Sequence, residues 1–187
     1  GVGLVVSVDW GDGTTNTLLS HNYTSSFTGT VSITVAAGSV TQFGTGSSSW
    51  IGGDKLTTVA TSRDTGSLNW GLPGITSLDT AFYEATILTS VPNYIPNTIV
   101  NLQKTFYKCS NFNQDIVDWD TYNVASMISM FNGCTVFNQN IRPWKVDSAV
   151  PLTDMFISAT AMITEYTGTS GFGTTPTHIF FNYEPSS

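Results

Sequence analysis

The fold is decided by two similar segments, TFYKCSNFNQDIVDW at residues 105–119 and MFNGCTVFNQNIRPW at residues 130–144. They match at an offset of 25 residues, so Phe, Cys, Phe, Asn-Gln, Ile and Trp recur in the same order. A fixed period of roughly 20 to 50 residues is typical of proteins built from stacked repeats. One such repeat cannot bury its own apolar face, and stacking creates a continuous core. We therefore predict a solenoid centred on this pair of segments.

The period extends beyond these two segments in both directions. A column of Leu or Met and a column of Phe continue at offsets of 24 or 25 residues. Ala85 and Ala159 occupy the places that Cys109 and Cys134 hold in the central repeats, which indicates a column of small, buried side chains. The predicted repeat core consists of Leu78, Phe82, Leu102, Phe106, Cys109, Phe112, Ile116, Met127, Phe131, Cys134, Phe137, Ile141, Leu152 and Phe156.

The chain divides into three regions, with a β domain at 1–45, the solenoid at 46–166 and a C-terminal capping strand and tail at 167–187. Within a repeat, Leu102 and Phe106 are four residues apart on a short helical or turn-like arm, and in a helix this spacing places both on one face. A short strand such as 112–119 follows the arm. After the last repeat, residues 178–183 read as one more strand that closes the stack. The predicted fold class is mainly β with short helical arms.

The N-terminal region shows a different pattern, the alternation of apolar and polar residues that predicts β-strands. Strands are expected at 2–10, around 15–19 and at 31–35. Asp12-Gly13 lies between the first two, and this dipeptide favours a tight turn. Three or four strands cannot close a β-sandwich by themselves. We therefore expect missing upstream chain, packing of these strands on the solenoid end, or contact with a partner.

The order of residues in this region, Val-Asp-Trp-Gly-Asp-Gly-Thr at 8–14, His-Asn-Tyr at 21–23 and then an alternating strand, resembles the second half of a PKD-type immunoglobulin-like β-sandwich. The resemblance covers about residues 5–36. It implies a partial PKD-like domain in which a structural turn is formed by Asp9, Trp10, Asp12, His21 and Tyr23.

The repeated pattern Met-Phe-x-x-Cys-x-x-Phe-Asn-Gln-x-Ile-x-x-Trp, which residues 130–144 carry almost completely, resembles the BspA-like leucine-rich surface repeats, also known as the DUF285 family. The resemblance covers about residues 54–160. It implies a leucine-rich-repeat solenoid of roughly four units of about 25 residues each. Proteins that combine a PKD-like piece with such repeats occur on bacterial cell surfaces and among phage structural proteins.

Composition excludes two classes of partner. The net charge is −7 and only six residues are Lys or Arg, whereas phosphate binding needs clustered basic side chains, so we expect no nucleic acid. The longest apolar run, 4–6, is too short to span a bilayer, so we expect no membrane insertion. Few charges among many Ser, Thr, Asn and Gly residues are common on secreted and particle-surface proteins.

No arrangement of residues in the sequence indicates catalysis. His21 and His178 are the only histidines, and neither lies beside a nucleophile motif, so we expect no enzyme activity. Cys109 and Cys134 lie in adjacent repeats, where neighbouring strands are close enough for a disulfide. The alanines in their column favour free thiols instead. No cluster of His, Cys and Asp predicts a zinc site, and we expect no metal and no cofactor.

Three further sets of residues allow a structural and a functional interpretation. Calcium binding at Asp115, Asp118 and Asp120 is disfavoured, because the next repeat lacks acids at these positions. Asn113-Gln114 and Asn138-Gln139 are expected to satisfy backbone groups in turns. Trp119 and Trp144 are either core residues or an exposed aromatic platform for a glycan or another partner.

Together these observations predict a non-enzymatic structural and recognition protein on a virion surface, such as a phage decoration, attachment or fibre protein. The alternative is a bacterial cell-surface or secreted adhesin that binds a host protein or glycan. Either way the expected partner is a protein in an assembly, in a capsid, a tail or a cell surface, with a glycan as a second class. The expected location is a virion surface or the extracellular surface of a cell.

Overall fold

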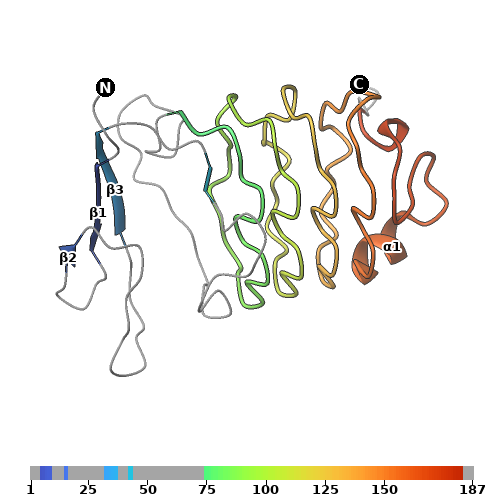
Figure 1. Cartoon of the computed structure of the whole chain (residues 1–187). Helices are drawn as coiled ribbons and strands as arrows, with labels where there is room; N and C mark the ends of the chain where they lie inside the picture. The colour runs from blue at the N-terminus through green and yellow to red at the C-terminus, as the bar shows by residue number, and fades with distance from the viewer. Residues whose placement is uncertain (1–4, 10–14, 17–31, 38–41, 44–73, 183–187) are drawn as a thin grey trace.

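A computed structural model describes residues 5–9, 15–16, 32–37, 42–43 and 74–182. Near the N-terminus, β1 (Val5–Asp9), β2 (Thr15–Asn16) and β3 (Ser32–Ala37) form one antiparallel sheet in the order β2-β1-β3 (Figure 1). Val8 pairs with Asn16 on one side and Ile33 on the other. Val- and Ile-rich alternation favours strands. β1 and β2 lie within the stretches where the sequence predicts strands, and β3 overlaps the third stretch and ends two residues beyond it.

Residues 74–182 wind into successive coils, one per sequence repeat, that lie side by side (Figure 1). Main-chain N–H groups of one coil donate to carbonyl groups of the next at every second residue. Between the second and third coils these bonds are Leu102 to Ser126, Lys104 to Ile128, Phe106 to Met130 and Lys108 to Asn132, at 2.7–2.9 Å. The same positions in the first and third coils, beginning at Leu78 and Met127, donate in the same way. The repeat period is therefore also the period of the hydrogen-bond ladder.

The intervening N–H groups turn back within their own coil, so the arm takes the turn-like form and not the helical one. Thr105 donates to the carbonyl of Leu102, and Cys109 donates to that of Phe106. Between them Lys104 and Lys108 have φ of 51° and 57°, in the left-handed region. A left-handed residue at every fourth position interrupts a right-handed helix, and the arm is a chain of tight turns. The left-handed positions recur at Thr80, Glu84, Ser129, Gly133, Asp154 and Ser158.

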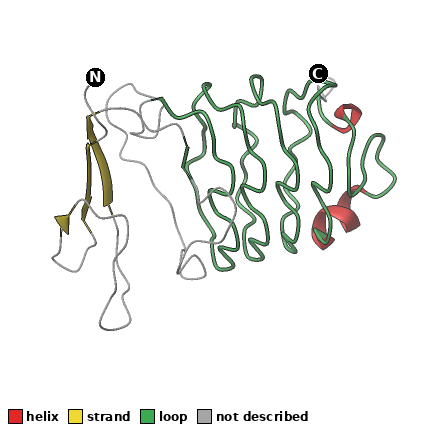
Figure 2. Cartoon of the chain, viewed as in Figure 1, coloured by secondary structure: helices red, strands yellow, loops and turns green. Residues whose placement is uncertain are grey.

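The predicted strand at 112–119 is also absent, because side chains there bind the backbone that a strand would pair. Gln114 is hydrogen-bonded through its amide to Val91 of the preceding coil, and Asp115 accepts from the N–H of Val117. In the described part of the stack, parallel strand pairing is limited to single bridges, Gln42–Ser77, Ser77–Asn101 and Asn101–Ser126. Figure 2 accordingly shows the coils almost entirely as loops.

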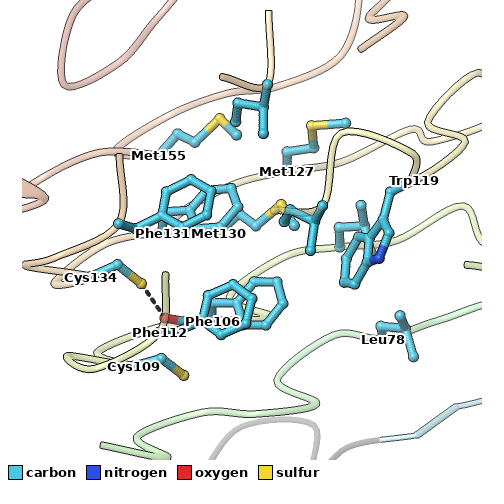
Figure 3. Close-up of a cluster of buried hydrophobic side chains, with 14 of the residues drawn as sticks. Leu78, Phe106, Cys109, Phe112, Trp119, Met127, Met130, Phe131, Cys134 and Met155 are labelled. Carbon is cyan, nitrogen blue, oxygen red and sulfur yellow. Dashed lines mark hydrogen bonds between the residues drawn. The ribbon is translucent and has the colours of Figure 1, made fainter. Parts of the chain in front are cut away.

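The interior of the stack is filled by columns of aromatic rings. Phe82, Phe106, Phe131 and Phe156 stack with centroid separations of 5.3, 5.5 and 5.9 Å. Phe112 lies against both Phe106 and Phe137 (Figure 3). Every residue of the predicted repeat core is buried. A column of identical side chains packs well here because the coils repeat with a nearly constant translation.

Both ends of the aromatic column are covered. At one end, Phe43 donates its N–H to the carbonyl of Ser77, and its ring lies 6.2 Å from that of Phe82. At the other end, Phe172 and Phe180 contact Phe156, the last ring of the column. The chain reaches this end through α1 (Thr160–Tyr166).

The last strand predicted at 178–183 is wrong, because a short 3-10 helix, η2 (His178–Phe180), stands in its place. Helical turns place both Phe180 and Phe181 in the interior, whereas consecutive residues of a strand point to opposite faces. Beyond it Asn182 donates its N–H to the carbonyl of Trp144. The segment therefore closes the stack without adding a strand.

Candidate functional site

The two cysteines are buried free thiols with a structural role. Cys109 donates from Sγ to the carbonyl of Phe82, and Cys134 donates to that of Phe106 (Figure 3). Burial raises the pKa of both Cys109 and Cys134 far above the ordinary thiol range. Because the thiolate is the reactive form of cysteine, these side chains are poor nucleophiles and poor metal ligands.

Both candidate platform tryptophans belong to the core. Trp119 and Trp144 are each 2% exposed and stack on one another at 6.4 Å. Their indole N–H groups donate to the carbonyls of Pro92 and Ile116 in the preceding coils. The interpretation of these rings as an exposed platform is therefore wrong. An indole can be buried at little cost when its N–H finds an acceptor, and each coil supplies one.

The acidic residues of the loops brace turns. Asp115, Asp120 and Asp147 each accept a hydrogen bond at Oδ1 from the N–H two residues further on. Asn140 accepts the same kind of hydrogen bond from the N–H of Arg142. Its side chain is an amide, which lacks the charge of a carboxylate. This local pattern is the Asx-turn, in which a side chain substitutes for a backbone acceptor. In the described ranges, no three His, Cys, Asp or Glu side chains are grouped so that they could hold a metal ion.

The side-chain amides bind backbone groups of neighbouring coils. Gln114 accepts from the N–H of Val91 and donates to its carbonyl, at 2.7 and 2.9 Å. Asn182 makes the equivalent pair of bonds to Val146 at the end of the stack. Gln139 instead donates to the carbonyl and to Oδ1 of Asn113. These amides therefore fix one coil on the next.

Most residues of the predicted PKD-like turn cannot be placed. Trp10, Asp12, His21 and Tyr23 lie outside the described residues. Asp9 ends β1, where it is paired with Thr15 and Ser32. The other histidine, His178, begins η2 and is exposed. No described residue brings a nucleophile and a base together at these positions.

The most distinctive surface feature is a set of four side chains that we name the tyrosine patch: Tyr83 and Glu84 of one coil, and Tyr107 and Lys108 of the next. The two tyrosine rings stack at 4.6 Å with an angle of 10° between their planes. Beside them Lys108 Nζ lies 2.9 Å from Glu84 Oε1 and 5.3 Å from the centre of the Tyr107 ring. All four side chains are at least partly exposed.

Electrostatics couples the members of the tyrosine patch. The hydrogen bond from Lys108 to Glu84 raises the pKa of the ammonium group, which is thus held in its charged form. The pKa of Tyr83 is also raised, first by partial burial and then by the negative charge of Glu84. Tyr83 is therefore a neutral hydrogen-bonding group at neutral pH. Lys108 and Glu84 neutralise each other, and the patch carries no net charge.

A row of hydroxyl groups runs across the coils near the patch. Ser110 Oγ donates to the carbonyl of Thr86, Thr135 Oγ1 to that of Ser110, and Thr160 Oγ1 to that of Thr135, at 2.9–3.2 Å. We call these four residues the hydroxyl ladder. Thr86 and Ser110 each follow a patch residue by two positions, with the buried Ala85 or Cys109 between them. The ladder therefore borders the patch on both of its coils.

Sequence reasoning missed the tyrosine patch, although a signal for it exists. The dipeptides Tyr83-Glu84 and Tyr107-Lys108 are 24 residues apart, which is one repeat. Aligned repeats place identical rings and opposite charges side by side. In the third coil the same two positions hold Asn132 and Gly133, so the patch is confined to the first two described coils.

The repeat itself connects the chain to a known family. A family model described as "Mycoplasma protein of unknown function, DUF285" matches residues 59–170, more than half of the chain. The chain belongs to the DUF285 family. No curated protein and no solved structure matches it. The match to DUF285 includes both the aromatic column and the tyrosine patch. Within the described part of this DUF285 protein, no helix is long and apolar enough to cross a membrane.

Proposed function

We propose that this DUF285 protein is a non-enzymatic structural and recognition protein displayed on a surface, and that the tyrosine patch contacts its ligand. The observation that supports the proposal is the partly exposed, parallel stack of Tyr83 on Tyr107 across two coils. Tyrosine is favoured in binding surfaces because its ring offers a large contact area and its hydroxyl a polar group. Here the two rings are presented together.

The coil stack holds the side chains of the tyrosine patch in an ordered arrangement before a ligand binds. The patch residues are joined across the coils by ring stacking and by the Lys108–Glu84 ion pair, and the main chain beneath them is joined by Glu84 N–H to the carbonyl of Tyr107. Side chains that are already ordered lose little conformational entropy when a ligand binds. A rigid solenoid surface of this kind is suited to recognition of a partner.

The surface we favour is that of a virion, where the protein would serve as a phage decoration, attachment or fibre protein. Three observations support this. The repeats resemble BspA-like leucine-rich repeats, the N-terminal strands resemble part of a PKD-like domain, and the chain carries few charges. In this proposal the coils form a leucine-rich-repeat solenoid, and the N-terminal strands belong to a sandwich completed by a neighbouring protein of the assembly.

A bacterial cell-surface or secreted adhesin is the second candidate. The description of the DUF285 family names Mycoplasma, which is a cellular organism and not a virus. The two candidates differ in where the protein is displayed. Antibodies against the chain should label intact purified virions of its source if the first is correct, and intact cells or culture fluid if the second is. Labelling of disrupted cells alone would contradict display on either surface.

The role of the patch is tested by binding of the purified chain to surfaces that the intact virion or cell recognises. Tyr83→Ala and Tyr107→Ala should each weaken binding strongly. The matched control is Tyr122→Ala, because Tyr122 is 77% exposed and lies outside the patch. Equal binding by all three variants would contradict the assignment of the patch.

A further inference from the structure

We infer that the tyrosine patch binds an uncharged carbohydrate. This inference rests on the proposed recognition role and adds to it the chemical class of the ligand. Three properties of the site carry it: the balance of charge, the combination of hydrogen-bond donors and acceptors, and an aromatic face at the end of the tyrosine stack.

The charges of the site disfavour an ionic ligand. Lys108 and Glu84 are bonded to one another at 2.9 Å, so neither offers an unbalanced charge to a ligand. The chain as a whole carries a net charge of −7, which repels sulfated, sialylated and phosphorylated molecules. An uncharged ligand meets neither obstacle.

The hydroxyl ladder adds acceptors beside the donors of the patch, which are the Tyr83 and Tyr107 hydroxyls and the Lys108 ammonium group. A carbonyl oxygen can only accept, so the hydroxyls of Ser110, Thr135 and Thr160 must donate their protons to it. Each of these oxygens then presents its lone pairs, and the Glu84 carboxylate is also an acceptor. A ligand rich in hydroxyl groups, which both donate and accept, complements such a surface, and carbohydrate has this composition.

The aromatic face is provided by Tyr107. Its ring is stacked on Tyr83 on one side, whereas the next coil places Asn132 instead of an aromatic residue at the equivalent position. Among the described residues, the tyrosine stack therefore ends at Tyr107. The C–H groups of a sugar ring carry partial positive charge and pack on the negative face of an aromatic ring.

The small extent of the patch also favours a glycan over a protein. A stable protein–protein interface buries about 800 Å² on each partner, which corresponds to 20–30 residues a side. The patch comprises four side chains on two coils. One or a few sugar units would cover it.

The first experiment measures binding of the purified full chain to an array of uncharged and sialylated or sulfated glycans. We expect retention on uncharged glycans only. Tyr107→Ala should weaken it by about tenfold, equivalent to roughly 1.4 kcal/mol of binding free energy, and Lys108→Ala less. Tyr122→Ala is the control variant. Each variant should also keep the melting temperature of the natural protein, which shows that it remains folded. Retention on anionic glycans alone, or on uncharged glycans without dependence on Tyr107, would overturn the inference.

The second experiment separates this inference from the proposed function. Target cells are treated with periodate, which cleaves vicinal diols of sugars, or with protease, before the chain is added. Loss of Tyr107-dependent binding after periodate but not after protease supports a carbohydrate ligand. Loss after protease but not periodate leaves the recognition role intact and overturns the carbohydrate inference. Binding that does not depend on Tyr83 or Tyr107 contradicts the proposed role of the patch itself.

Discussion

Gly133 packs against Lys108 so closely that a β-carbon at position 133 would lie 2.9 Å from Lys108 Cγ and 3.2 Å from Lys108 Cα. Gly133 also has φ of +79°, in the left-handed region. The same position in the other coils holds Glu84, Lys108 and Ser158, which tolerate this φ without being glycine. In the third coil, the close contact with Lys108 therefore favours glycine beyond what the left-handed backbone alone demands.

The first prediction is that Gly133→Ala lowers the free energy of unfolding by about 2–4 kcal/mol, the sum of left-handed strain and overpacking. The matched control is Gly168→Ala, since Gly168 has φ of +91° but nothing within 4 Å of an added β-carbon. That variant should cost about 1–2 kcal/mol, from strain alone. Urea unfolding of both variants measures the difference. Equal losses would show that the contact with Lys108 is unimportant.

The second prediction concerns the aromatic column. Phe131 stacks between Phe106 and Phe156 and is fully buried, so Phe131→Ala should cost about 3–5 kcal/mol. The control is Val136→Ala, because Val136 lies in the same coil and is 42% exposed. It should cost less than about 1 kcal/mol. A loss below about 1 kcal/mol for Phe131→Ala in denaturant would show that the column does not hold the stack together.

The period of the repeat and the inward-facing columns could be predicted from the sequence, because a buried column requires the same apolar type in every coil. Phe82, Phe106, Phe131 and Phe156 meet that requirement visibly. The conformation of the arm could not be predicted. Thr80, Lys104 and Ser129 adopt left-handed φ, and nothing in their identities signals it, since such positions usually hold glycine or asparagine.

The candidate site was harder to predict than the core. Trp119 and Trp144 recur like Phe106 and Phe131, but recurrence alone does not distinguish an inward column from an outward one. The carbonyl acceptors that allow the indoles to be buried belong to the main chain, and sequence does not reveal where they point. The stacking of Tyr83 on Tyr107 depends on the same alignment of coils, and among residues 74–182 this pair of tyrosines has no second copy.

The third prediction tests the amides that join the coils. Gln114 makes two hydrogen bonds to the backbone of Val91, so Gln114→Ala should cost about 1–3 kcal/mol, at 0.5–1.5 for each bond. Gln114→Glu should cost as much or more, because a carboxylate cannot donate to the Val91 carbonyl and is repelled by it. Thermal or urea unfolding measures both. If Gln114→Glu were as stable as the natural protein, the amide would not be bonded to both the N–H and the carbonyl of Val91.

The fourth prediction is a loss of stability in mild alkali that depends on the thiols. In the folded protein burial raises the pKa of Cys109 and of Cys134, whereas in the unfolded chain both have the ordinary value of about 8.5. Below this pH both states keep the thiol protons, and the thiols cause no pH dependence. As the pH rises above it, only the unfolded state releases the protons. The unfolded state is therefore favoured, and stability falls with rising pH.

The size of this effect follows from linkage between proton release and unfolding. Each thiol should remove roughly 2 kcal/mol between about pH 8.5 and pH 10. Urea unfolding of the natural protein and of the double variant Cys109→Ala, Cys134→Ala over this range measures it. Alanine is the matched replacement, because Ala85 and Ala159 hold the same position in the outer coils.

The double variant should be less stable than the natural protein at pH 7, because it lacks the two Sγ hydrogen bonds. Its stability should decline much less toward pH 10. Above about pH 10 the tyrosines also titrate, so the comparison ends there. If the free energy of unfolding fell equally with pH in the two proteins, the thiols would ionise equally in the folded and unfolded states and would not be buried away from water.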